Sequence, residues 1–329
     1  MKFDRTAPGG GIEVYCTLQT GKVFLEWKFY CEEEEAKDGA ETDGAGAFCK
    51  ETAVRIIVLD GEGNVVLEGW QRIGEEELLK TALLRPRLWN STKDPYLYTV
   101  EAFLIRKRKE EKSDEPWEVM DSITVKFPIR SFRRIPGKGW YLNDEPFCQK
   151  AVAYVPPEKA VEKEEFFQDL SLFAEAGANT LCIREPHMQP PCFYEICEEM
   201  GFLVWAQGAQ QAPDGRLFCR GPFRTGLFYR YKALWREEPF VFLDQESLIR
   251  GTNGNYSITV YSNQKKTALY VDGMLFEFQS GETAFVFHEI PFHGLFLCLT
   301  AEAGECSMSL SVHRTFTKAS LFHDNYPLE

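Results

Sequence analysis

Side chains capable of chemistry gather in one short stretch of the sequence, "IREPHM" at residues 183–188. It places Arg184, Glu185 and His187 directly after the apolar run "TLCI", which we interpret as a strand of a parallel βα unit. Functional groups gather at the carboxyl ends of such strands, so these side chains are candidates for a binding site. The competing interpretation is that Arg184 and Glu185 pair with each other beside a loop.

Three aromatic residues form a second candidate site. Tyr154 and Trp205 lie at the ends of predicted strands, and Trp140 lies in the stretch that leads into the same segment. Exposed aromatic rings stack on the apolar faces of sugar rings, which makes the three residues a candidate carbohydrate platform. Core packing is the alternative, and it suits Trp205 best because this residue ends an apolar strand.

Metal and cofactor chemistry finds little support in the sequence. The ten cysteines show no CxxC pair and no metal-like spacing, and Cys192 and Cys197 are too far apart on a helix for a zinc pair. The acidic run Glu32–Glu35 lacks the spaced oxygen ligands of a calcium loop. We therefore expect no metal, no cofactor, and reduced thiols in a cytoplasmic protein.

The composition narrows the class of partner. The chain of 329 residues carries a net charge of −13 and has a pI of about 5.1, which disfavours a phosphate backbone as partner. No stretch approaches the ~20 apolar residues of a membrane span, and the N-terminus lacks the apolar core of a signal peptide. We expect neither a nucleic acid nor a membrane as partner, and a cytoplasmic location.

Two β-rich regions flank an α/β segment, so the chain is predicted to be mainly β. Residues 12–134 contain short runs rich in Val, Ile and aromatic residues, with a hairpin at "DGEGN", and their spacing predicts an immunoglobulin-like β-sandwich. Residues 240–316 repeat the pattern around a second hairpin at "VDG". The expected domains are a sandwich with two long loops at 1–134, the α/β segment at 135–239, a second immunoglobulin-like sandwich at 240–318 and a tail at 319–329.

The sequence of the α/β segment predicts the order strand, helix, strand, helix, strand. The runs "CQKAVAYV", "TLCI" and "FLVWA" are short and apolar. Between the first two, Phe166, Leu170, Phe173 and Ala174 recur at helical spacing before a stop at Gly177. Further helices are predicted for "PPCFYEICEEMG" and "GLFYRYKALWREEP". This alternation predicts a parallel βα unit of about three strands.

Five segments resemble, in order, glycoside hydrolase family 2, the family of β-galactosidases and β-glucuronidases. They cover about residues 12–316 and read "LLRPRLWNSTKDPYLYTVEAFL", "FPIRSFRRIPGKGWYLNDEPFCQKAV", "NTLCIREPHMQPPCFYEICEEMGFLVWAQ", "FYRYKALWREEPFVFL" and "VYSNQKKTALYVDG". In the second of these, Pro128 and Asp144 stand where the family has glycines. The resemblance implies a β-sandwich, a (β/α)8 catalytic barrel and a second sandwich.

The resemblance also implies what the barrel should contain. A complete barrel takes about 250 residues, whereas only a loop-sized stretch lies between Gln207 and Leu227. In the family the acid/base Glu follows an Asn after the fourth strand and the nucleophilic Glu lies on the seventh, but this sequence has no Asn-Glu pair. The family's N-terminal jelly-roll domain has no counterpart either. We therefore expect an incomplete, truncated barrel without its catalytic carboxylates.

The sugar-contact positions of the family have changed as well. Cys182 falls where the family's Arg is expected, and Ala153-Tyr154-Val155 replaces the family's Asn-Arg-His. Arg184, Glu185 and His187 would be what remains of the sugar pocket. The substrate-binding residues expected from the resemblance and the aromatic pattern are Arg184, His187, Tyr154 and Trp205.

These observations favour a family 2 relative that no longer cleaves glycosidic bonds and keeps a role in carbohydrate binding or subunit association. Retaining hydrolysis needs two carboxyls about 5–5.5 Å apart. One alternative is an active glycosidase with non-standard carboxylates, for which the candidates are Glu185, Asp214 and Glu237. Another is a deletion product without a selected function. Three strands leave a parallel edge open, so a second copy of the chain or a hydrolase partner subunit is an expected partner. A carbohydrate is the other expected partner.

Overall fold

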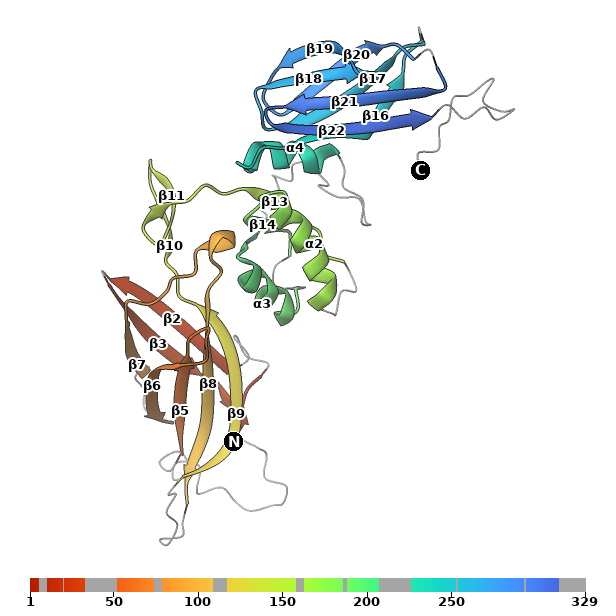
Figure 1. Ribbon diagram of the computed structural model, residues 1–329. Helices are drawn as coiled ribbons and strands as arrows, with labels where there is room; N and C mark the ends of the chain where they lie inside the picture. Colours follow the sequence, from red (N-terminus) through yellow and green to blue (C-terminus); the bar gives the residue numbers. More distant parts are fainter. Residues whose placement is uncertain are drawn as a thin grey trace. The chain divides into compact units, whose positions relative to one another are not determined.

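In the computed structural model the chain forms two compact units, and its elements are shown in Figure 1. Unit 1 comprises Met1–Gln149, Pro156–Leu170 and Glu185–Trp205, and unit 2 comprises Lys150–Val155, Ser171–Arg184 and Ala206–Glu329. The structure describes residues 1–5, 11–19, 21–32, 52–73, 79–108, 117–157, 163–185, 188–206, 226–252, 254–292 and 294–313.

Unit 1 contains two antiparallel sheets that share one core. One has the strand order β2-β3-β7 and the other the order β6-β5-β8-β9. This three-plus-four arrangement confirms the predicted sandwich. The strands are β2 Ile12–Gln19, β3 Lys22–Phe29, β5 Thr52–Leu59, β6 Val65–Arg72, β7 Leu79–Leu84, β8 Leu97–Lys107 and β9 Trp117–Pro128.

Alternation along the strands builds the core of this sandwich. On β3, Val23, Leu25 and Trp27 are fully buried, while the residues between them face outward. The indole N–H of Trp27 donates to Thr81 Oγ1 of β7 at 2.8 Å. Its ring also meets Phe127 edge-on, with 5.4 Å between centroids. The largest core side chain of this sheet therefore has its one polar atom satisfied.

Unit 1 also contains several short elements outside the two main sheets. The turn between β11 and β12 places Asn143 and Asp144 at φ 53° and 69°, the left-handed region that a two-residue hairpin turn requires. Asn and Asp tolerate this region better than other non-glycine residues, so Asp144 is compatible with a position where a glycine was expected. The elements are β1 Lys2–Phe3, β4 Cys31–Glu32, η3 Ser91–Lys93, β10 Phe132–Ile135, β11 Gly139–Leu142 and β12 Glu145–Pro146.

The α/β segment follows the predicted order of elements. It runs β13 (Ala151–Ala153), α2 (Lys163–Glu175), β14 (Thr180–Ile183), α3 (Pro191–Met200) and β15 (Leu203–Ala206). Strands β13 and β14 pair in parallel in unit 2, with Val152 opposite Leu181. On α2, Phe166, Leu170 and Phe173 are buried as their spacing predicts, whereas Ala174 is only half-buried. The parallel βα pattern is confirmed.

Unit 2 also contains the predicted second sandwich. Its sheets have the orders β16-β17-β20 and β19-β18-β21-β22, and the residues that face both form one apolar core. The β18–β19 turn places Asp272 and Gly273 at φ 49° and 81°, as the Asp-Gly hairpin predicts. The elements are α4 Gly226–Trp235, β16 Val241–Arg250, β17 Tyr256–Ser262, β18 Lys266–Val271, β19 Met274–Ser280, β20 Ala284–Ile290, β21 Phe296–Ala303 and β22 Cys306–His313.

Several predicted features fall outside the described residues. They are most of the two polar loops of the first sandwich, the Gly/Pro/Gln-rich stretch before α4, and the tail. None of the helices seen in the described ranges is long and apolar enough to cross a membrane.

Candidate functional site

The predicted polar site follows β13 and β14. In unit 2 the backbone N–H of Tyr154 donates to the carbonyl of Cys182 at 3.0 Å, which extends the β13–β14 pairing by one residue. The Tyr154 ring is only 5% exposed and meets Phe173 of α2 edge-on at 5.3 Å. Arg184, directly after β14, is exposed. The ring therefore packs in the interior, and the guanidinium faces solvent.

Of the three candidate carboxylates, the structure describes two. Glu185 in unit 1 is exposed, and its backbone carbonyl accepts from the N–H of Met188 at 3.1 Å. Glu237 follows α4 in unit 2 and is also exposed. A glycosidase acid requires a desolvated carboxyl beside a second one, whereas both of these side chains are exposed. His187 and Asp214 lie outside the described residues.

Two of the predicted aromatic residues do come together in unit 1. Trp205 of β15 and Trp140 of β11 meet edge-on with 4.5 Å between ring centroids, and Phe132 stacks on Trp140 at 5.0 Å. Both tryptophans are half-buried, and the guanidinium of Arg134 lies over Trp140 at 5.8 Å. We call these four residues the tryptophan cluster. Its rings pack together and still present part of their surface to solvent.

A polar junction holds α3 against the first sandwich and thereby positions β15. The indole N–H of the fully buried Trp89 donates to the carbonyl of Glu198 at 2.8 Å. Arg130 stacks on Trp89 at 4.4 Å and contacts Glu198 Oε1 through Nη2 at 3.1 Å. Burial raises the pKa of Glu198, and the charge of Arg130 opposes this rise. Sequence reasoning missed this junction; its only signal was that "RLWN" and "PIRS" lie in segments that resemble the family.

Gly201 closes the same junction. It ends α3 in the left-handed region at φ 83°, and its carbonyl accepts from the Ser91 hydroxyl at 2.8 Å. A Cβ at this position would collide with the backbone of Ser91 and Thr92. Only glycine therefore fits between α3 and η3.

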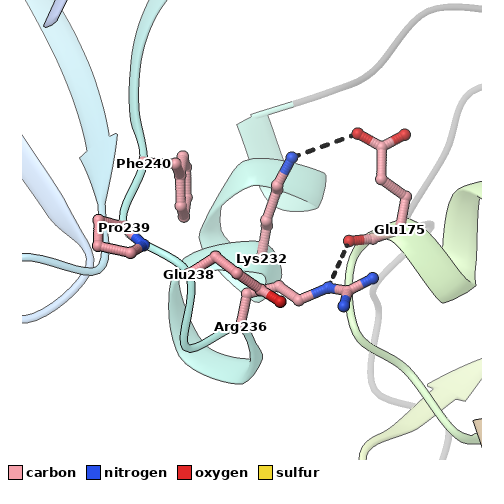
Figure 2. A pocket seen from close by; sticks show the side chains of 6 residues that line it. All are labelled: Glu175, Lys232, Arg236, Glu238, Pro239 and Phe240. Carbon is pink, nitrogen blue, oxygen red and sulfur yellow. Dashed lines mark hydrogen bonds and ion pairs between the residues drawn. The ribbon is translucent and has the colours of Figure 1, made fainter. Parts of the chain in front are cut away.

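A hollow of about 270 Å3 in unit 2 lies between α4 and the end of α2, as Figure 2 shows. Arg236 donates through Nε to the Glu175 carbonyl at 3.1 Å and through Nη2 to the Ala174 carbonyl at 2.8 Å. These are carbonyls of the last turn of α2, which lack partners within the helix. Lys232 pairs with the Glu175 carboxylate at 3.3 Å. Both cations are used to hold the two helices together, so this hollow is a structural joint.

Metal ligands do not gather in the described ranges. No group of three or more His, Cys, Asp or Glu side chains there is placed to hold an ion. Cys16 and Cys31 are free, and burial raises the pKa of each thiol to about 11. The Cys16 and Cys31 thiols are therefore protonated and unreactive at neutral pH.

Comparison with known proteins identifies relatives of the chain. No family model matches it. A β-glucuronidase from Bacteroides fragilis is 26% identical over 178 residues, which is 53% of this chain and 22% of that protein. The match thus spans about a fifth of the curated relative.

Solved structures share the fold. An FMN-binding β-glucuronidase from Faecalibacterium prausnitzii gives a TM-score of 0.70 at 17% identity, covering 95% of this chain and 75% of that one. A β-glucuronidase from Bacteroides uniformis gives 0.66 at 12% identity, covering 95% and 62%. A family 2 member from Bacteroides cellulosilyticus gives 0.65 at 12% identity, covering 95% and 63%. Together with the sequence match, these likenesses make the chain a relative of glycoside hydrolase family 2, the family of β-glucuronidases and β-galactosidases.

Proposed function

We propose that this chain does not hydrolyse glycosides and instead binds carbohydrate. The proposal rests on the length of the α/β segment. It runs from β13 at Ala151 to the end of α4 at Trp235, and only residues 207–225 lie between β15 and α4. A catalytic barrel of eight βα units takes about 250 residues. The strands that would carry an opposed pair of carboxylates have no room in this segment.

The exposed settings of Glu185 and Glu237 support the same proposal. Catalysis by two carboxyls depends on rigid placement, because a misplacement of about 1 Å costs about 100-fold in rate. Both side chains are exposed to solvent. The alternative of an active glycosidase with non-standard carboxylates would have to use Glu185, Asp214 or Glu237.

The tryptophan cluster is the proposed carbohydrate contact. Half-buried rings lose little conformational entropy on binding because their neighbours already fix them. The solvent-exposed part of these indole rings suits the C–H face of a sugar, and the adjacent Arg134 offers hydrogen-bond donors to hydroxyl groups. Arg184, His187 and Tyr154 are proposed as separate carbohydrate contacts outside this cluster, and Tyr154 is limited by its exposure of only 5%.

Hydrolysis assays test the first half of this proposal. A panel of nitrophenyl glycosides incubated with the protein should release nitrophenol at the rate of buffer alone. Turnover above buffer that falls in Glu185→Gln, Asp214→Asn or Glu237→Gln would establish the alternative. A thermal melt recorded on the same sample should be cooperative, whereas a deletion product without a selected fold would melt without a transition.

Oligosaccharide binding tests the second half. Trp140→Ala should weaken binding about two- to tenfold, since a stacked aromatic ring contributes about 0.5–1.5 kcal/mol beyond the area it buries. Trp70→Ala is the matched control, because Trp70 is an exposed tryptophan on β6 outside the cluster. Equal affinities of both variants and the wild type would refute this role of the cluster.

Subunit association is a second candidate function, supported by an apolar edge strand in unit 2. β19 is at one edge of its sheet, and Met274, Leu275 and Phe278 on it are 74%, 49% and 64% exposed. The strand contains no Lys or Pro, the residues that commonly protect such an edge. We propose that a second copy of the chain or a hydrolase subunit covers it.

Light scattering after size exclusion tests this association. The wild type should show a mass that increases with concentration, and Phe278→Lys should remain a monomer. Phe296→Lys is the control, because Phe296 is 61% exposed on the inner strand β21. A wild-type monomer at all concentrations would contradict association between copies.

We also propose a cellular location and a division into domains. The free thiols of Cys16 and Cys31 suit a reducing compartment, which supports a cytoplasmic protein. We propose domains at 1–134, 135–239 and 240–318 with a tail at 319–329, and limited proteolysis should cut near these boundaries.

A further inference from the structure

A second hollow, of about 380 Å3, lies on the first sandwich away from the tryptophan cluster. In the strand register Leu59 lies opposite Thr99, and Thr99 lies opposite Lys126. Their neighbours Val58 and Val100 point into the core, so this row belongs to the outward face of the four-stranded sheet. Glu199, the residue before the end of α3, closes one side.

The floor of this hollow is apolar. Leu59 of β5 and Leu97 of β8 line it together with Pro95, and Thr99 supplies a hydroxyl among them. Pockets for small ligands commonly combine such a floor with a few fixed polar groups, and they have volumes of about 300–1,000 Å3. A volume of about 380 Å3 is enough for a single six-membered ring.

The rim carries an ammonium group paired with a carboxylate. Lys126 Nζ contacts Glu199 Oε1 at 3.1 Å, and Lys163 Nζ contacts Glu199 Oε2 at 3.0 Å. Burial raises the pKa of Glu199, but the hydrogen bonds from Lys163 and Lys126 outweigh it and lower the pKa overall. The carboxylate is therefore ionised at neutral pH and remains an acceptor next to the Lys126 donor.

The opposite wall is a preformed turn. Asp60 Oδ1 accepts from the backbone N–H groups of Glu62 at 2.9 Å and Asn64 at 2.8 Å, and the N–H of Gly61 donates to the Tyr96 hydroxyl at 2.6 Å. These bonds fix the turn before any ligand arrives. A fixed wall lowers the entropy cost of binding.

We propose that this hollow binds one neutral pyranose ring, with its C–H face on Leu59, Leu97 and Pro95 and neighbouring hydroxyls on Lys126 and Glu199. A uronic acid fits less well, because its carboxylate would lie near Glu199 and Asp60. No side chain of this site belongs to the tryptophan cluster. The inference therefore stands apart from the proposed carbohydrate contact and can succeed or fail independently.

NMR titration of the full chain with a methyl hexoside and with methyl glucuronide tests this site. The neutral glycoside should saturate with a Kd in about the millimolar range, as expected for a ligand of this size, and the amide signals of Gly61 and Thr99 should shift. Lys126→Met and Glu199→Gln should each weaken binding about tenfold. Lys93→Met, the same change at an exposed lysine of η3, should bind like the wild type.

Different outcomes separate the two carbohydrate proposals. If Trp205→Ala lost binding while Lys126→Met and Glu199→Gln kept the affinity of the wild type, binding in the hollow would be refuted. The tryptophan cluster would then be the carbohydrate site. Saturable binding without shifts of Gly61 and Thr99 would also refute binding in the hollow. So would the absence of saturable binding by the neutral glycoside, or tighter binding of the glucuronide.

Discussion

Replacement of Gly201 by alanine is the sharpest structural test of how α3 is held. The substitution has two separate costs. At φ 83° an alanine would have to adopt the left-handed region, which costs about 1–2 kcal/mol. The new Cβ would also meet the backbone of Ser91 and Thr92, which cannot move aside as a flexible side chain could. Overpacking of this kind adds about 1–3 kcal/mol.

Gly137→Ala supplies the matched control. Gly137 has φ 76°, and a Cβ added there would have no atom within 4 Å. This variant therefore has only the cost of a left-handed backbone and no steric collision. Urea unfolding followed by tryptophan emission reports on the junction, because Trp89, Trp140 and Trp205 lie in unit 1. Gly201→Ala should destabilise unit 1 by about 2–5 kcal/mol and Gly137→Ala by about 1–2 kcal/mol. Equal losses would refute the close approach of α3 to η3.

Three further predictions concern individual contacts. The pKa of Glu199 is lowered from 4.5, so its carboxylate stabilises the fold above pH 4.5 and loses this effect as the pH falls through the lower folded pKa. In urea unfolding, Glu199→Gln should therefore lower the free energy of unfolding by about 1 kcal/mol at pH 7 and leave it unchanged at a pH below the folded pKa. Trp27→Phe removes the hydrogen bond to Thr81 and should cost about 1–3 kcal/mol by the same assay. Arg236→Met removes the bonds to the last carbonyls of α2 and should lower the melting temperature, whereas Arg230→Met, an exposed change on α4, should leave it unchanged.

Much of the fold could be predicted because the local patterns were strong. Period-two alternation identified β3, β5 and β8, whose inward residues form the core. Strand β7 is harder to predict from the sequence, since "LKTALL" is composed largely of residues that favour helices. Its Leu79 and Leu83 are nevertheless packed against the core of the sandwich. Tertiary burial overrode local propensity at this strand.

The candidate site was less predictable because its parts are distant in the sequence. Trp140 and Trp205 could each be identified as aromatic candidates, but their contact depends on how β11 and β15 lie in unit 1. The hollow on the first sandwich depends in the same way on strand register and on the end of α3. Neither the register nor the helix position follows from periodicity alone.

Mechanism-based labelling tests the absence of hydrolysis most directly. A retaining glycosidase forms a covalent bond between its nucleophilic carboxylate and the sugar, so an activated 2-fluoro glycoside traps it as a stable adduct. Intact-mass spectrometry after incubation with gluco-, galacto- and glucurono-configured reagents should show the unmodified mass of this chain. A stoichiometric sugar adduct mapped to Glu185, Asp214 or Glu237 would contradict the account.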